Sequence, residues 1–278
     1  MSFKSILTVV TDAADPPPSL EQAISLARDL DAHLEVICLG IDHALSSYYE
    51  VGVGAALLQA SLEQAQSRGK KIREAVEKRL ERSGLRTNTS IGVVTSPDTG
   101  NPVARIARFS DLAVASLPYG PGATPENVSI VEELLFDAAC PTLCLPRDAE
   151  LRLPESIVVA WNFSAQALRA TRVALPFLKA AKQVRIAAID PPGHGPEGSD
   201  PGGQLAVLLS RHGVNCEISV LAKTGSSVGA SLNQFAQENG ADMIVMGAYG
   251  HSRFREALLG GTTRVMLQEA KLPVLMAH

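Results

Sequence analysis

Short apolar runs alternate along this chain with longer stretches in which apolar residues recur every three or four positions. Residues 5–10 and 156–161 are two of the apolar runs, and residues 20–30 and 165–179 are two of the periodic stretches. An uninterrupted apolar run predicts a strand buried on both faces, whereas the longer spacing predicts an amphipathic helix. The alternation of the two is typical of a parallel sheet covered by helices, so we predict an α/β fold.

The order of predicted elements in the first half of the chain returns in the second half. Residues 5–10 correspond to 156–161, and residues 34–42 correspond to 184–190. The remaining pairs are 90–95 with 217–222, 106–115 with 235–246, and 140–145 with 272–276. The repeat therefore predicts two tandem, open, twisted, five-stranded parallel sheets with helices on both faces, a Rossmann-like arrangement.

The repeat also predicts where the chain divides. We expect one domain at residues 1–148, a linker at 149–155 that contains Pro154, and a second domain at 156–278, which suits a chain of 278 residues. The halves differ after their second strand, where the first has a long helix near residues 55–83 and the second has a proline- and glycine-rich loop. Mixed charges on the long helix predict a solvated face, and we hypothesise that this helix contacts a neighbouring chain or partner.

Composition narrows the classes of function. Twenty-five basic and twenty-nine acidic residues give a net charge of −4, which favours neither a nucleic acid nor an anionic membrane as partner. No apolar run approaches the ~20 residues of a membrane span, and no secretion signal is recognised, so a cytoplasmic protein is expected. The four cysteines lack zinc-ribbon or disulfide-scaffold spacing and are expected to be reduced and mostly buried.

Two glycine patterns match known functional motifs, but the residues around them do not favour those functions. The run from Gly193 to Gly198 fits the dinucleotide fingerprint, but the prolines around it forbid the helix that would hold a pyrophosphate. The run around Ser227 fits a nucleophile elbow, with Asp242 and His251 following in the order of a serine hydrolase. A serine at this position more simply caps a helix, so the hydrolase is the minor alternative.

A third glycine pattern is longer and better placed. Gly247 and Gly250 follow a buried strand, and nine residues later Gly260, Gly261 and Thr262 open an amphipathic helix. The carboxyl end of a parallel strand is where such folds bind ligands, and helix-opening amides and threonine hydroxyls can donate hydrogen bonds to phosphate. Glycines at these points could equally serve tight turns between strand and helix, and spacing alone favours neither interpretation.

At these residues the chain resembles the universal stress protein family, in its tandem type. The glycine pattern matches the family's G-x2-G-x9-G-[ST] nucleotide motif from Gly247 to Gly260, and the order of strands and helices extends the resemblance to nearly the whole chain. The resemblance implies an adenine nucleotide alpha hydrolase-like fold and a stress-response regulatory protein. It also implies ATP or AMP, with Mg²⁺, as ligand, and domains that commonly dimerise.

The resemblance further implies which residues hold the nucleotide. Asn162 stands where the family usually has an aspartate, Ala188 where backbone contacts adenine, and the motif glycines where ribose and phosphates lie. The implied set is Asn162, Ala188, Met246, Gly247, Gly250, His251, Gly260, Gly261 and Thr262. Two members depart from the family: Asn162 lacks the carboxylate charge, and Gly261 lacks a hydroxyl that Thr262 could replace.

The first half departs further from the family motif. Its corresponding stretch holds Pro118 and Pro121, which lack amide hydrogens, and no glycine lies at the later phosphate position. We therefore expect nucleotide only in the second domain, with no catalytic residues, no metal ligands and no enzymatic activity. The rival interpretation is a tandem scaffold that binds no nucleotide and acts through protein contacts.

Two further expectations concern mutation and assembly. Gly247→Val or Gly260→Val is expected to abolish nucleotide binding while leaving the fold intact. Residues 140–145 and 273–277 are apolar sheet-edge candidates, which are generally paired or covered in folded proteins. We therefore expect the halves to pack as a pseudo-twofold pair, with sheet edges also available for a homo-oligomer.

Overall fold

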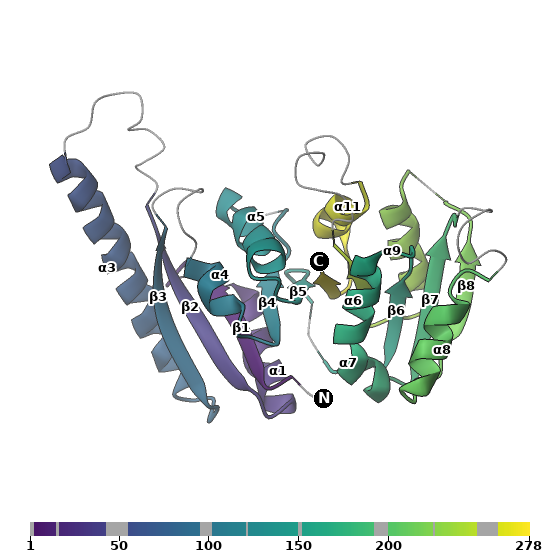
Figure 1. The fold of residues 1–278 in the computed structure, drawn as a ribbon. Coiled ribbons are helices and arrows are strands. Elements are labelled where there is room, and N and C mark those ends of the chain that lie inside the picture. The colour runs from purple at the N-terminus through teal and green to yellow at the C-terminus, as the bar shows by residue number, and fades with distance from the viewer. Residues whose placement is uncertain are drawn as a thin grey trace. The chain divides into compact units, whose positions relative to one another are not determined.

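The computed structural model describes residues 3–14, 17–42, 55–94, 102–120, 122–149, 152–191, 200–224, 226–248 and 261–278, with the side chains of 55–58 excepted. These residues form two compact units (Figure 1). The N-terminal unit comprises Phe3–Ser116 and Val128–Cys140, and the C-terminal unit comprises Leu117–Asn127 and Pro141–His278. No helix in the described part of the chain is both long and apolar enough to cross a membrane.

The N-terminal unit is built on parallel strands in the order β3-β2-β1-β4. The order reverses at β1, as in doubly wound α/β folds. The strands are β1 (Ser5–Val10), β2 (His33–Ile41), β3 (Thr87–Val94) and β4 (Leu112–Ser116), and the helices are α1 (Pro18–Asp29), α3 (Ala55–Leu80), α4 (Pro102–Ala107), α5 (Pro125–Glu132) and the π-helical turn η1 (Glu133–Asp137).

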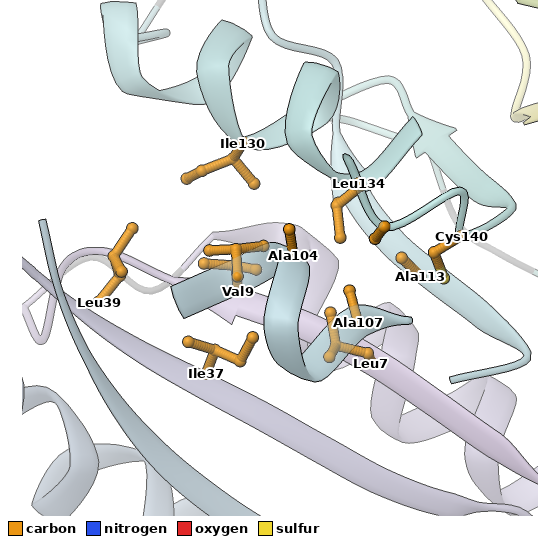
Figure 2. Close-up of a cluster of buried hydrophobic side chains, with 12 residues drawn as sticks. Leu7, Val9, Ile37, Leu39, Ala104, Ala107, Ala113, Ile130, Leu134 and Cys140 are labelled. Atoms are coloured by element: carbon orange, nitrogen blue, oxygen red, sulfur yellow. The ribbon is translucent and has the colours of Figure 1, made fainter. Parts of the chain in front are cut away.

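Alternate residues of the central strands serve opposite faces of this sheet. Leu7 and Val9 of β1 and Leu39 of β2 join a buried cluster with residues of α4, α5 and η1 (Figure 2). Gly40, the next residue along β2, faces α3 instead. Because successive side chains of a strand point to opposite faces, the mostly apolar runs seen in the sequence bury both sides of the sheet.

The long helix α3 packs unusually closely on β2. A Cβ atom placed on Gly40 would lie 2.0 Å from the carbonyl oxygen of Ala65, and Gly69 of α3 lies beside the same point. The residues of α3 that are buried recur every three or four positions: Ser61, Ala65, Gly69, Ile72, Val76 and Leu80. The apolar side of α3 thus packs within its own unit, and only the charged, exposed side stays available for the hypothesised partner.

The C-terminal unit repeats this plan and adds one strand. Its strand order is β5-β10-β9-β6-β7-β8. The strands are β5 (Thr142–Leu145), β6 (Ser156–Ala160), β7 (Gln183–Ile189), β8 (Glu217–Leu221), β9 (Met243–Gly247) and β10 (Val274–Ala277), and the helices are α6 (Ala165–Val173), α7 (Leu175–Ala180), α8 (Gly203–Arg211), α9 (Val228–Glu238) and α11 (Gly261–Glu269). The predicted α/β class is confirmed.

Strand β5 differs from the prediction. It belongs to the C-terminal unit and pairs antiparallel with β10, with Cys144 opposite Val274 and Thr142 opposite Met276. The expectation of two separate, wholly parallel five-stranded sheets is therefore wrong for this strand. The expectation that residues 140–145 and 273–277 are paired or covered is confirmed, since these two edges satisfy each other's backbone groups. The pseudo-twofold packing of the halves and the domain boundary at residue 148 stay predictions.

In each half, an aspartate accepts hydrogen bonds from backbone amides at the start of the first strand. The carboxylate of Asp111, just before β4, accepts hydrogen bonds from the amides of Lys4 and Ser5 at 2.7 and 3.0 Å. Asp242, just before β9, accepts from the amides of Glu155 and Ser156 at 2.9 and 2.8 Å. This shared contact supports the alignment of the two halves that the sequence predicts.

The four cysteines are free thiols, and they differ in accessibility. Burial raises the pKa of the Cys38, Cys140 and Cys144 thiols to about 12, and Cys216 is only partly buried. Because the thiolate is the reactive form, we expect a disulfide reagent at pH 8 to label Cys216 first and the other three only after unfolding. Counting thiols released with and without denaturant checks this, and rapid labelling of all four in the native protein would contradict it.

Candidate functional site

The candidate site lies at the carboxyl ends of β6 and β9, where the strand order of the C-terminal unit reverses. The two strands are parallel neighbours, with Val159 opposite Val245. From β6 the chain goes on to β7 on one side, and it later returns to β9 on the other side. The helices that connect such strands diverge at this point, which is the usual ligand position in open α/β sheets.

Asn162 follows β6 and forms a tight turn before α6. Its Oδ1 accepts hydrogen bonds from the Ser164 amide at 3.2 Å and the Ser164 hydroxyl at 2.7 Å. Ser164 in turn caps α6 by accepting from the Ala167 amide at 3.1 Å. The oxygen of Asn162 that was expected to face a ligand therefore serves the turn, whereas its amide nitrogen, a donor, takes no part in these contacts.

The N-terminal half has an acid at the corresponding position. Asp12 follows β1, and its Oδ1 accepts from the Ala14 amide at 2.7 Å, two residues later, as Asn162 does with Ser164. Either side chain can supply this oxygen. The two segments share this contact but differ in backbone, because Phe163 has a positive φ and Ala13 does not.

Gly247 ends β9 and lies against the first turn of α6. A Cβ atom here would lie 2.5 Å from the Ala167 nitrogen and 2.7 Å from the Gln166 carbonyl carbon. Both are main-chain atoms, which cannot move aside as a side chain can. The expectation that Gly247→Val leaves the fold intact is therefore wrong, because this glycine is required for strand β9 to contact α6.

The later part of the motif lies at the start of α11. Gly261 is the first residue of this helix and is exposed, and no atom of the described residues lies within 4 Å of its Cβ position. Thr262 is half-buried, and its carbonyl oxygen lies against Gly229 near the start of α9. The other predicted members, Gly250, His251 and Gly260, lie outside the described residues.

Two predicted members are buried within strands. Ala188 lies inside β7, where it is paired with Val220 of β8, and Met246 is buried in β9 opposite Met276 of β10. The last residue of β7 is Ile189, so the backbone of Ala188 forms part of the sheet's hydrogen-bond ladder. The structure thus brings Asn162 and Gly247 together around the start of α6, and the registers of β7 and β9 on β6 place Ala188 at the same level of the sheet as Gly247.

Sequence reasoning missed an aromatic pair beside Asn162. The rings of Trp161 and Phe163 are 5.6 Å apart at an angle of 50°. Phe163 has a φ of 66° and is 41% exposed. A positive φ is uncommon for phenylalanine, and apolar periodicity carries no signal for it. Trp161 is the single tryptophan of the chain, so it can report on events at this site.

The serine hydrolase alternative is contradicted by the positions of its residues. Ser227 caps α9, its hydroxyl oxygen accepting from the Ala230 amide at 3.1 Å. Asp242 lies beyond the other end of α9, bound to the amides that enter β6. A helix of 11 residues is roughly 16 Å long, so these two groups cannot share one histidine. The preferred interpretation, a helix cap, is confirmed.

The corresponding place in the N-terminal half lacks a comparable helix start. Its helix α5 begins at Pro125, which has no amide hydrogen, whereas α11 begins at Gly261, which has one. Pro118 is buried in the loop that follows β4. Within the described ranges of the whole chain, no group of three or more histidine, cysteine or acidic side chains is placed to hold a metal ion.

The parallel sheet and its strand reversal make this an α/β protein of the Rossmann-like class. Residues 154–278 match the model of the Universal stress protein family. A sequence relative, Universal stress protein Slr1230 of Synechocystis sp., is 24% identical over 136 residues, which are 49% of this chain and 46% of that protein. This chain thus matches about half the length of that relative.

Solved structures resemble the chain over nearly all of its length. A universal stress protein from Archaeoglobus fulgidus DSM 4304 aligns with 98% of this chain and 95% of its own, with a TM-score of 0.70 and 14% identity. A putative universal stress protein from Pseudomonas aeruginosa UCBPP-PA14 aligns with 99% of this chain and 93% of its own, with a TM-score of 0.61 and 16% identity. At these identities the similarity establishes the fold.

Proposed function

We propose that this chain is a tandem universal stress protein that binds an adenine nucleotide, ATP or AMP, in its C-terminal half and acts as a stress-response regulator. The observation that carries the proposal is the position of the glycine motif. It begins at the last residue of β9, beside β6 at the strand reversal, and reaches the first turn of α11. The family match covers this same half of the chain.

The described residues offer particular groups to such a ligand. The exposed start of α11 presents the Gly261 amide and the Thr262 hydroxyl, which suit phosphate oxygens. Asn162 offers its amide nitrogen near the end of β6, where the ribose is expected. The motif residues Gly250, His251 and Gly260 complete the proposed set, with Mg²⁺ as the ion that accompanies a nucleoside triphosphate.

We propose that the N-terminal half binds no nucleotide. Pro118 and Pro125 remove amide donors from its corresponding loop and helix start. We also propose binding rather than turnover, since the motif offers no lysine of the P-loop kind and no positioned carboxylate pair. The protein would then respond to nucleotide by changing its contacts with a partner, and hydrolysis would be slow and incidental.

Nucleotide binding can be measured on the full chain without labels. Titration with ATP or AMP in the presence of Mg²⁺ is expected to change the fluorescence of Trp161, and calorimetry is expected to show one site per chain. Mass spectrometry of the purified protein should also detect retained adenine nucleotide. Absence of all three signals would overturn the proposal and favour the scaffold interpretation.

A charge at the start of α11 should weaken this binding selectively. Gly261→Glu meets no atom of the described chain within 4 Å of the Cβ position and suits the helix start, but it places a carboxylate beside the proposed phosphates. We expect at least about tenfold weaker binding, equivalent to about 1.4 kcal/mol. The matched control is Gln204→Glu in the first turn of α8, which should bind as the parent does. Equal affinities of the two variants would place the phosphates elsewhere.

A further inference from the structure

Strand β8 is the last strand in the order of the C-terminal unit (Figure 1). Two of its apolar side chains are exposed. Ile218 is 37% exposed and Val220 is 56% exposed. The two are separated by one residue, so they lie on the same face of the strand. Val207 of the neighbouring helix α8 is 51% exposed. We call Val207, Ile218 and Val220 the β8 patch.

The patch arises from the difference between the two halves. In the N-terminal unit, the long helix α3 packs on β2 and β3, and the edge strand β3 carries polar side chains. Asn88 and Ser90 of β3 donate hydrogen bonds to Glu35, and Thr89 donates to Glu77. The corresponding helix α8 has nine residues against the 26 of α3, and β8 presents isoleucine and valine.

The backbone N–H and C=O groups of β8 point alternately toward β7 and away from it. The Asp190 amide donates to the Leu221 carbonyl at 2.8 Å, so the peptide groups of Leu221 point toward β7. Backbone groups alternate in direction along a strand. Those of Ile218 and Val220 therefore point away from β7, and within the described part of the chain no strand lies on that side.

We propose that β8 pairs antiparallel with β8 of a second copy of this chain, about a twofold axis at Val220. In this register the outward backbone groups of Val220 bond to those of the other Val220, and Ile218 bonds opposite Ala222. The exposed apolar side chains of both copies then cover each other. The two sheets become one, which removes the open edge that folded proteins generally protect.

Charge complementarity selects this register. With Val220 at the axis, Glu217 of each copy lies opposite Lys223 of the other, which gives two cross-strand pairs of opposite charge. An axis at Ser219 would place Glu217 opposite Leu221 and leave Lys223 without an acid. The Glu217 carboxylate lies 3.5 Å from the Arg185 Nε, so it is on the face of the sheet that carries Arg185.

Sedimentation equilibrium of the full chain tests the association. A small edge contact predicts weak association, so the mass measured over a concentration series should rise from 29.4 kDa toward twice that value. Val220→Lys places two like charges opposite each other, and we expect at least about tenfold weaker association. Lys223→Glu should weaken it severalfold, whereas Lys223→Arg and the edge control Asn88→Lys on β3 should not.

Cross-linking tests the register itself. In a Cys216→Ser background, Val220→Cys places two thiols across the axis at a spacing that a disulfide can span. Ile218→Cys on the same exposed face places them about four residues, roughly 13 Å, apart along the strand. Copper phenanthroline should therefore link Val220→Cys chains into dimers and leave Ile218→Cys chains as monomers on a non-reducing gel.

The results separate this interface from other arrangements. A wild-type chain that stays monomeric across the concentration series overturns the proposal and leaves the β8 patch to a different occupant. A dimer that Val220→Lys and Lys223→Glu leave unchanged also overturns it, because association must then use another surface. Equal cross-linking of Val220→Cys and Ile218→Cys would refute the register. Circular dichroism of each variant verifies that it is folded.

Discussion

Gly247→Val is expected to destabilise the C-terminal unit, whether or not a ligand is present. The new side chain would overlap main-chain atoms of Gln166 and Ala167 in the first turn of α6. Overpacking of this kind costs typically 1–3 kcal/mol, and because the overlap involves backbone we expect at least about 3 kcal/mol. Urea unfolding followed by Trp161 fluorescence reports on this unit directly.

Gly261→Ala provides the matched control within the same motif. Among the residues that the structure describes, none has an atom within 4 Å of its Cβ position, and alanine favours a helix over glycine by up to about 1 kcal/mol. This variant should unfold at the same or a higher urea concentration than the parent. If Gly247→Val unfolded at the parent's midpoint, the close contact between β9 and α6 would be contradicted. Because Gly247→Val is expected to destabilise the fold, a loss of ligand binding in this variant would not show that Gly247 contacts the ligand.

Gly40→Val is expected to separate α3 from its sheet. The Cβ position of Gly40 lies 2.0 Å from the Ala65 carbonyl oxygen and 3.0 Å from the Gly69 nitrogen, so the helix must move outward to admit any side chain. We expect a loss of at least about 3 kcal/mol, because displacement of α3 also uncovers apolar side chains of β2 and β3. Circular dichroism during urea unfolding measures this loss in the N-terminal unit.

Substitution of Gly69, on the α3 side of the contact with Gly40, should change the stability of the N-terminal unit much less. A Cβ atom on Gly69 would meet chiefly the Cγ2 methyl of Ile91 at 2.8 Å, which is a side-chain atom and not backbone. Gly69→Ala also gains helix propensity of about 1 kcal/mol in the middle of α3, so a small net change is expected. A loss as large as that of Gly40→Val would show that Ile91 cannot move.

The apolar runs and their repetition were sufficient to predict the α/β class and most strands. Residues 5–10 match β1, and residues 217–222 match β8 to within one residue. The direction of β5 could not be predicted, because its partner β10 lies far along the chain and apolar runs carry no orientation. The roles of Asp111 and Asp242 were equally hidden, since each binds amides that approach only in the folded chain.

The glycine spacing predicted one structural feature of the candidate site, and whether the site binds a ligand stays a prediction. It indicated that Gly247 lies at the carboxyl end of a buried strand, and Gly247 is the last residue of β9. Glycine spacing could not distinguish a glycine that leaves space for a ligand from one that leaves space for a packed helix. That distinction depends on which residues pack against the glycine in the folded chain. Gly247 contacts α6, whereas Gly261 is open, although both belong to one motif.

Because β5 pairs with β10, cleavage of the chain at the linker would separate two hydrogen-bonded strands. A cut within residues 149–155 would leave β5 on the first fragment, although its hydrogen-bond partner lies on the second. Each fragment would then expose a short apolar strand, Thr142–Leu145 or Val274–Ala277, with unpaired backbone groups. Such edges recruit other strands, so the separated halves should recombine with each other or aggregate rather than persist as independent domains.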